Sequence, residues 1–472
     1  MRPYPYLADA AIVLTPFNVF IWSDEMTSSH AHAQWSSRMG FVLAATGSAV
    51  GLGNIWKFPY MVGQSGGAAF VLVYLVCIAL IGLPILVSEW LIGRRGQKNP
   101  INTMAQLAEQ NGHHRSWALI GGIGILGAFL ILSFYSVIGG WALAYMLDAA
   151  TGAFSGLDKN AIGASFEAFL ASPGTLFGWH TAFMSLTAIV VAMGVSGGLE
   201  RGSKVMMPAL GLILLVLVGY GTTTGSFGAA VEYLFKPDWS KLDGQVLMAA
   251  LGHAFFTLSL GMGIMMAYGS YLGQEVNLLR TARTVVLMDT AIALCAGLAI
   301  FPIVIAHGLD PSAGPGLIFV TLPIAFGNMT GGIVLGALFF LLLTFAALTS
   351  SISLLEPVVE LLEERTSLGR AGATLVASIT IWALGIAALL SFNLWSGVKF
   401  AGLNIFDLLD YVTSKFMLPV AGLGAIVFAA WKLEQGSVRQ ELGLSQHEFK
   451  LWTFLSRYVA PLGVLFVFWH NI

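Results

Sequence analysis

Apolar residues run along this chain in long continuous stretches. Each stretch is about the twenty residues that a helix needs to cross a bilayer, and none shows the strict alternation of a membrane β-strand. The pattern therefore predicts an all-α membrane protein with 11 transmembrane helices. The eleven stretches lie near residues 40–62, 68–92, 118–149, 181–196, 205–224, 247–272, 285–307, 332–361, 373–391, 403–431 and 450–469.

Composition supports the membrane assignment and excludes other classes. The 472 residues are 57% hydrophobic and only 10% charged, whereas soluble domains carry about 25% charged residues. A soluble enzyme is therefore excluded, and a net charge of -2 gives no basic surface for nucleic acid. The two cysteines, Cys77 and Cys295, lie inside apolar runs and are expected to be buried hydrophobic residues.

Basic residues predict the orientation. If the first stretch runs from inside to outside, 16 of the 22 Lys and Arg residues fall in cytoplasmic segments, and Lys159, Lys236, Lys241 and Lys399 fall outside. The positive-inside rule then places the N-terminus in the cytoplasm. Eleven crossings place the C-terminus outside, and we expect the protein in the plasma (inner) membrane.

The first 34 residues are expected to form an N-terminal cytoplasmic tail. Residues 6–22 are apolar but short, are interrupted by Asp9 and Pro16, and lack a small-residue cleavage site. We interpret Met26 as the native start of translation.

Two stretches contain glycines that a regular helix in lipid would not favour. Residues 47–54 hold Gly47, Gly51 and Gly53, and residues 259–263 hold two more, each costing about 1 kcal/mol relative to alanine inside a helix. One interpretation is close helix packing, because Gly47 and Gly51 form a GxxxG pattern. The other is a pair of discontinuous helices around a site at mid-membrane. Their separation by five spans favours the second and fits an inverted five-plus-five repeat.

Several spaced motifs together resemble the neurotransmitter:sodium symporter family, and most closely its bacterial amino-acid branch with eleven helices. The motifs comprise Trp35, Arg38 and Gly40, then residues 47–54 with Phe58 and Pro59, then Pro84, Glu89, Trp90, Gly93 and Arg94, then Phe255, Phe256, Thr257 and Gly261, and finally Ala346, Thr349, Ser350 and Ser351. The resemblance covers about residues 35–435. It implies a carrier, not an enzyme, with discontinuous helices 1 and 6. The expected organisation is a first repeat at 35–230 (helices 1–5), a second at 231–435 (helices 6–10), and helix 11 within 436–472.

The resemblance also implies two sodium ions bound by oxygen atoms. The matching residues of the first site are Ala49, Asn54, Thr257 and Asp289, and those of the second site are Gly47, Val50, Ala346, Thr349 and Ser350. Taken singly, the hydroxyls of Thr349 and Ser350 could instead bond to the preceding helical turn.

Asp289 departs from the family, which usually has Asn at this position. A carboxylate inside a bilayer is a functional hypothesis by default. We expect Asp289 to bind sodium and to supply the negative charge that chloride provides in animal members, so no chloride requirement is expected. A protonated Asp289 bonded to a neighbouring helix is the alternative, and proton counter-transport stays open.

The substrate class follows from the charges. Amine-transporting relatives have an Asp at the position of Gly51, so here the negative charge must come with the substrate, as in an amino acid. Its carboxylate would face Leu52, Gly53 and Tyr135, and its ammonium group Ala49, Phe256, Thr257 and Ser259. The implied side-chain pocket carries no charge, which favours neutral, hydrophobic or aromatic amino acids. It comprises Ile131, Tyr135, Phe256, Met262, Ser350 and Leu354.

Gates and moving parts are also implied by the resemblance. Lys57 and Asp410 match the outer pair, although lysine lacks the fork of the usual arginine. Tyr271 and Glu364 match the inner gate, where His32 replaces an arginine and Trp35 is expected to contribute.

A further segment, from Gly198 to Pro208, is interpreted as the part of helix 5 that opens to release sodium inward. The alternative is a simple boundary between a loop and a helix.

Three other sequence patterns have simpler interpretations than a cofactor or metal site. The GxGxxG match at 122–127 lies in an apolar stretch without a preceding strand, and His113 and His114 lack further metal ligands. Glu89 is expected to support a broken helix, with a proton relay through it or Glu356 as the alternative.

The competing functions are a carrier of betaine or GABA, a sodium-dependent sensor with little flux, and a channel. The expected partners are the small substrate and membrane lipid, without nucleic acid or an obligate protein partner.

Overall fold

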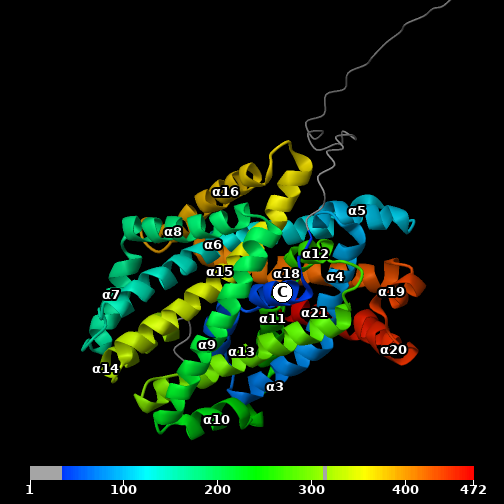
Figure 1. Cartoon of the computed structure of the whole chain (residues 1–472). Coiled ribbons are helices and arrows are strands. Elements are labelled where there is room, and N and C mark those ends of the chain that lie inside the picture. The colour runs from blue at the N-terminus through cyan, green and yellow to red at the C-terminus, as the bar shows by residue number, and fades with distance from the viewer. Residues whose placement is uncertain (1–33, 312–315, 472) are drawn as a thin grey trace, which may run out of the picture. The chain divides into compact units, whose positions relative to one another are not determined.

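Helices make up the described part of the chain, residues 34–311 and 316–471, in the computed structural model (Figure 1). Within these residues the one β contact is an isolated bridge between Phe400 and Leu403. The all-α prediction is therefore confirmed. The proposed tail, Met26 and His32 lie outside the described residues.

Twenty-one α-helices follow one another along the described residues. They are α1 Arg38–Ala49, α2 Phe58–Gln64, α3 Ala68–Cys77, α4 Leu83–Gly96, α5 Pro100–Gln110, α6 Ala118–Ala150, α7 Lys159–Leu170, α8 Pro173–Ala192, α9 Arg201–Thr223, α10 Phe227–Phe235, α11 Gly244–Thr257, α12 Ile264–Ser270, α13 Leu278–Ala306, α14 Leu322–Asn328, α15 Gly332–Arg365, α16 Arg370–Leu390, α17 Ile405–Val412, α18 Leu418–Val427, α19 Gln435–Leu442, α20 Gln446–Phe454 and α21 Ala460–Asn471.

Short helical segments continue several of these helices. Seven are π-helical, namely η1 Gly53–Lys57, η2 Ile78–Gly82, η4 Val195–Glu200, η6 Leu317–Thr321, η7 Thr413–Met417, η8 Phe428–Lys432 and η9 Leu455–Val459, and two are 3₁₀ turns, η3 Arg115–Trp117 and η5 Trp239–Lys241.

Eight helical runs among the described residues are long and apolar enough to cross a membrane, or nine if the bent pair α1 and η1–α2 is one span. All eleven predicted stretches fall on helical segments, but those at 247–272 and 450–469 are not among these nine. The fourth predicted stretch begins too late, because α8 starts at Pro173 and not near residue 181. Proline is well accepted in a first helical turn. Because polar residues follow it, the first turns of α8 do not belong to an apolar stretch and the start of the helix was placed too late.

The first interruption lies where the glycines predicted it. Helix α1 ends at Ala49, residues 50–52 leave the helix axis, and the chain resumes through η1 and α2 at an angle of 46°. Close packing is present too, because a Cβ on Gly47 would lie 3.3 Å from Cβ of Thr349. Both interpretations of this glycine run therefore hold.

The second interruption separates α11 from α12. Ser259, Gly261 and Gly263 have φ angles of 53°, 72° and 71°, in the left-handed region that glycine tolerates best. A Cβ on Gly261 would also lie 2.1 Å from the carbonyl oxygen of Leu418. The second predicted break is therefore confirmed.

Two long helices frame these breaks. Helices α6 and α15 pack side by side (Figure 1), and α1 contacts α15, α9 and α13. The interrupted segments thus lie among helices that supply side chains to a common site.

Candidate functional site

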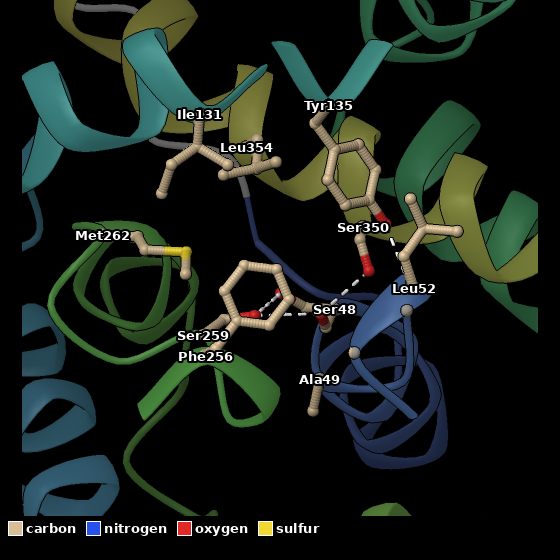
Figure 2. Close-up of a pocket in the computed structure, with 12 residues that line it drawn as sticks. Ser48, Ala49, Leu52, Ile131, Tyr135, Phe256, Ser259, Met262, Ser350 and Leu354 are labelled. Carbon is tan, nitrogen blue, oxygen red and sulfur yellow. Dashed lines mark hydrogen bonds between the residues drawn. The ribbon is translucent and has the colours of Figure 1, made fainter. Parts of the chain in front are cut away.

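A small cavity lies where the two interrupted helices meet α6 and α15 (Figure 2). Its lining comprises Ser48, Ala49, Gly51, Leu52, Gly53, Ile131, Tyr135, Phe256, Ser259, Met262, Ser350 and Leu354. Every predicted substrate-binding residue is in this set except Thr257, which is buried nearby. Ser48 also lines the cavity but was not among the predicted substrate-binding residues. Its place in the glycine-rich run is the only sequence signal for this role.

Polar atoms gather at the end of the cavity beside the first break. The amide of Leu52 donates to Tyr135 Oη at 3.3 Å. The carbonyl oxygen of Ser48 accepts from Ser259 Oγ at 2.9 Å and from Ser350 Oγ at 3.1 Å (Figure 2). Backbone freed by the break is thus satisfied by hydroxyl groups from two other helices, as buried polar groups require.

The opposite end of the cavity is apolar. Ile131, Met262 and Leu354 face it together with the ring of Phe256 (Figure 2), and no charged side chain is among the lining residues. The free space has a volume of about 20 Å³, which is room for roughly one water molecule. A large side chain could enter only if these groups moved apart.

The backbone of Gly51 lies very close to the hydroxyl groups at the polar end of the cavity. A Cβ at this position would lie 2.2 Å from Ser350 Oγ and 3.1 Å from Tyr135 Oη. The site therefore has no space for a side chain there, and in particular none for an acid that would pair an amine.

The first predicted sodium set comes together around Asp289 on α13. Its Oδ1 accepts from Asn54 Nδ2 at 2.8 Å and from Thr257 Oγ1 at 3.0 Å. Tyr74 Oη donates to Oδ2 at 3.3 Å, a contact for which the sequence held no signal. Asp289 is fully buried, so these three donors stabilise a carboxylate that water does not reach. The alternative of a protonated Asp289 also expected hydrogen bonds to neighbouring helices, and such bonds are present.

Most of the second predicted set also assembles. Thr349 Oγ1 lies 3.4 Å from the carbonyl of Val50 and 3.1 Å from that of Ala346, with Gly47 packed against it. Thr349 also bonds back to Phe345 O at 3.1 Å, as the alternative predicted. Ser350 differs, because its hydroxyl points to Ser48 at the cavity.

These sets consist of carbonyl, hydroxyl, amide and carboxylate oxygens. Among the described residues, no group of three or more His, Cys, Asp or Glu side chains could hold a metal ion. Oxygen atoms suit a hard cation and not the metals that need imidazole or thiolate ligands.

The expected outer pair is not formed. No hydrogen bond or ion pair joins Lys57 to Asp410; Lys57 Nζ instead lies 4.4 Å from the ring centroid of Phe256, and Asp410 accepts from Ser414 Oγ at 2.9 Å. Asp410 still acts electrostatically on Lys57. The reason is that a lysine ammonium group can use an aromatic face in place of a distant carboxylate.

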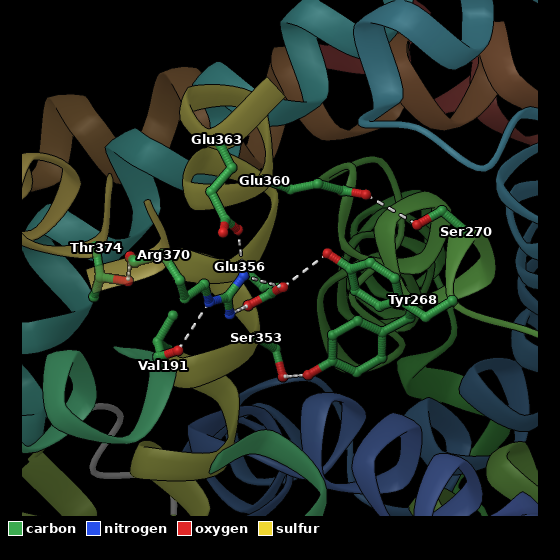
Figure 3. A network of polar contacts seen from close by, with 10 residues as sticks. Val191, Tyr268, Ser270, Ser353, Glu356, Glu360, Glu363, Arg370 and Thr374 are labelled. Carbon is green, nitrogen blue, oxygen red and sulfur yellow. Dashed lines mark hydrogen bonds and ion pairs between the residues drawn. The ribbon is translucent and has the colours of Figure 1, made fainter. Parts of the chain in front are cut away.

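Tyr271 and Glu364, both expected at the inner gate, have different partners, and the acid beside Tyr271 is Glu356 (Figure 3). Tyr271 Oη donates to Glu356 Oε1 at 2.8 Å, whereas Glu364 accepts from Asn99 and Asn102 at 2.5–2.8 Å. Glu364 lies further toward the end of α15 and turns toward the cap of α5. Glu356 is therefore the partner of Tyr271.

Arg370, at the start of α16, completes this network and was missed by sequence reasoning. It forms an ion pair with both carboxylate oxygens of Glu356, contacts Glu363 at 2.9 Å, and donates from Nε to Val191 O at 3.0 Å. A signal existed, because a buried acid such as Glu356 needs a cation, and the tight α15–α16 turn brings the arginine to it.

Trp35, which was expected at the inner gate, contacts Tyr268 and Tyr271. Its indole nitrogen donates to Tyr268 O at 3.1 Å, and its amide donates to Tyr271 O at 3.3 Å. Its ring packs on the rings of Tyr268 and Tyr271, with centroids 5.1 and 6.2 Å away. The segment before α1 is thereby tied to the end of α12.

Glu89 supports the second break as predicted. Its Oε1 accepts from the amide of Gly261 at 2.8 Å. The carboxylate thus satisfies backbone that the interruption of α11 and α12 leaves free.

The segment from Gly198 to Pro208 is helical throughout. The helix begins at Val195, so the alternative of a loop boundary between these two residues is wrong. A Cβ on Gly198 would lie 1.8 Å from Val190 O, so η4 packs directly on the end of α8.

Next to this turn, Glu200 accepts from Ser36 and Ser37 at 2.5–3.0 Å and pairs with Lys204 at 2.6 Å.

The patterns set aside in the sequence have structural roles. Residues 122–127 lie inside α6, which excludes a strand-turn-helix nucleotide fold there. His114 caps η3, and His113 Nε2 lies 3.2 Å from Lys432 O.

Comparison with known proteins places these sites in context. A sequence model described as the sodium:neurotransmitter symporter family matches residues 32–158 and 164–472. An uncharacterized sodium-dependent transporter of Bacillus subtilis is 38% identical over 93% of this chain and 98% of its own. Another, from Haemophilus influenzae, is 34% identical over 95% of this chain and 100% of its own.

A solved structure agrees with the fold. The crystal structure of MhsT in complex with L-phenylalanine superposes with a TM-score of 0.87 and 43% sequence identity, covering 93% of this chain and 100% of that one.

Proposed function

Because the chain belongs to the sodium:neurotransmitter symporter family, we propose that it takes up neutral, hydrophobic or aromatic L-amino acids by sodium-coupled symport with alternating access. Its relatives are sodium-dependent transporters, so the protein is a multi-pass membrane transporter and not an enzyme.

One observation carries the substrate proposal: a cavity with a polar end, an apolar end and no charged side chain. In the proposed complex the substrate carboxylate faces the amides of Leu52 and Gly53 and the hydroxyl of Tyr135, and its ammonium group faces Ser259 and the carbonyls of Ala49 and Phe256. Ile131, Met262 and Leu354 would surround the side chain. L-phenylalanine in MhsT supports this class.

The ion proposal is two sodium ions without chloride. Asn54, Thr257 and Asp289 would hold the first ion together with Ala49 and the substrate, and Gly47, Val50, Ala346 and Thr349 would hold the second. The hydroxyl of Ser350 would need to rotate from Ser48 to join them. The support is that these oxygens already converge.

Two coupled sodium ions would supply ample driving force. Each ion entering down 100 mV releases about 2.3 kcal/mol, and a tenfold gradient adds about 1.4 kcal/mol. Two ions could therefore support roughly 10⁵-fold accumulation of a neutral substrate.

The topology proposal keeps eleven spans, with α11–α12 and α20–α21 added to the nine runs that are long and apolar enough. The inverted repeats would be 35–230 and 231–435, with helix 11 in 436–472. The N-terminus would lie in the cytoplasm and the C-terminus outside the inner membrane, with lipid around the helices and no obligate protein partner.

For the gates, we propose that Lys57 and Phe256 close the outer side, with Asp410 contributing at longer range. Trp35, Tyr271, Glu356 and Arg370 would close the inner side. Unwinding between Gly198 and Pro208 would open a path from the second sodium set.

The test is uptake of a radiolabelled amino-acid panel into proteoliposomes with and without an inward sodium gradient. We expect concentrative uptake of Phe, Leu, Tyr or Trp and none of Asp or Lys. Betaine or GABA uptake would establish the osmolyte function instead, and binding without accumulation would indicate a sensor.

A further inference from the structure

Glu360 is a buried acid that the proposed transport cycle does not use. It lies on α15 one turn after Glu356 and is 4% exposed. Its Oε1 lies 2.9 Å from Ser270 Oγ on α12, and its Oε2 has no hydrogen-bond partner among the described residues. Figure 3 shows its carboxyl group directed to Ser270 and away from Arg370.

The Ser270 hydroxyl has two acceptors within reach, the carbonyl of Ala267 and Glu360, and the shorter contact is the one to Ala267. Ser270 Oγ lies 2.7 Å from the carbonyl oxygen of Ala267, which can only accept, and 2.9 Å from Glu360 Oε1. A serine hydroxyl has one hydrogen to donate. If Ala267 receives it, the contact with Glu360 needs a hydrogen from the carboxyl group itself.

The charges around Glu360 lead to the same conclusion. Among the described residues, the groups that face it are Glu356 and Glu364 from its own helix, Arg370 from α16, and Ser270 and Tyr271 from the α12 side. Arg370 is already shared by Glu356 and Glu363, so it is not a dedicated partner of Glu360. A buried carboxylate without its own cation is strongly disfavoured relative to the neutral acid.

We propose that Glu360 is a proton-binding site reached from the cytoplasm, and that its proton holds the inner ends of α12 and α15 together. Loss of the proton to cytoplasmic water leaves a third carboxylate beside Glu356 and Glu364, and repulsion among them favours separation of the two helices. Separation then hydrates the charge. The site rests on the proposed alternating access, because it needs an inner end that opens.

The experiment measures how easily the inner end opens as pH changes. Ser353 is buried, with its Oγ 2.7 Å from Tyr268 Oη at the inner side of α15. Ser353→Cys, in a background with Cys77→Ala and Cys295→Ala, serves as the reporter for a membrane-impermeant maleimide in detergent. Labelling rates are measured from about pH 6 to about pH 9, around the ordinary range of thiol ionisation, with Glu360 intact and with Glu360→Gln.

Glutamine keeps the shape and the donor of the neutral acid but cannot ionise. The ratio of labelling rates, intact protein over Glu360→Gln, removes the thiol's own pH dependence. We expect this ratio to rise with pH, by up to about tenfold per pH unit while Glu360 titrates. Glu109→Gln, an exposed acid paired with Arg115, should follow the intact protein.

A ratio that stays flat or falls with pH would overturn the proposal. If Glu360→Gln does not give a monodisperse protein, the labelling rate of the Ser353→Cys reporter with Glu360 intact is divided by that of a Ser240→Cys reporter, whose position is exposed, and the same rise is required. Labelling needs no substrate, so failure of the amino-acid panel leaves this result untouched and identifies the transport proposal as the one in error.

Discussion

Gly51 decides what the polar end of the cavity can bind. Its missing side chain lets Ser350 and Tyr135 approach the backbone of the first break, where a Cβ would lie 2.2 Å from Ser350 Oγ. In the proposed function, these hydroxyl groups and the amides of the first break meet a carboxylate brought by the substrate. The proposed specificity thus depends on one absent side chain.

Gly51→Ala should weaken binding of L-phenylalanine at least about tenfold, or about 1.4 kcal/mol, because Ser350 must leave its bond to Ser48. Isothermal titration in saturating sodium measures this. Gly211→Ala is the control, since nothing lies within 4 Å of that Cβ position. Equal affinity in both variants would show that Gly51 has no such role.

In the proposed function, Asp289 supplies the negative charge at the first sodium set in place of a bound chloride. Replacing chloride by gluconate should therefore leave sodium-driven uptake unchanged. Asp289→Asn should reduce uptake at least about tenfold, because a neutral amide removes the charge that attracts the ion, and chloride should restore part of it. Loss of uptake by the unaltered protein in gluconate would refute the expectation.

Among the helical elements, η4 contacts two neighbouring segments closely. It lies against the end of α8 through Gly198, and Glu200 at its end binds the serines before α1. Movement of η4 would therefore release the start of α1 as well. A helical turn that holds two neighbours in this way can couple them during opening.

Gly198→Ala should destabilise the closed inner side by about 1–3 kcal/mol, the usual range for overpacking, because its Cβ would lie 1.8 Å from Val190 O. The neighbouring Gly197→Ala has open space and is the matched control. Thermal unfolding in detergent should show a lower midpoint for Gly198→Ala alone. Identical midpoints would mean that η4 can shift without cost.

At the scale of the whole molecule, Arg370 links elements from both proposed repeats. It contacts α15 through Glu356 and Glu363 and α8 through Val191, and Tyr271 extends the network to the end of α12 and to Trp35. The inner ends of four helices thus meet at one cation. Its loss should affect them together.

Arg370→Met should lower the free energy of unfolding by about 3–5 kcal/mol, since it leaves the buried charge of Glu356 unpaired. The double variant Arg370→Met with Glu356→Gln should recover much of this loss, because no buried charge remains. Lys236→Met, in an exposed pair with Glu232, should change stability by less than about 1 kcal/mol. Chemical unfolding in mixed micelles provides the comparison, and a double variant no better than Arg370→Met would contradict the charge argument.

The cavity could be largely predicted from the sequence, and the gates could not. Gly51, Gly261 and Gly263 mark backbone that leaves the helix, and the family resemblance implied the side chains that line the cavity around it. The resemblance placed Tyr271 and Glu364 at the inner gate, but the rotation of α15 is what brings Glu356 to Tyr271. Contacts between side chains on different helices depend on rotation and tilt, which apolar patterns do not encode.

The amino-acid sequence by itself determined that this chain is an α-helical membrane protein with two interrupted helices. The reason is local: lipid demands long apolar runs whose backbone bonds are satisfied within each segment, and glycine marks the exceptions. Only the tertiary structure decided that Lys57 packs on Phe256, that Arg370 neutralises Glu356, and that Glu360 faces Ser270 without its own cation. Those outcomes depend on which side chains meet in three dimensions, where charge and hydrogen atoms must balance across helices.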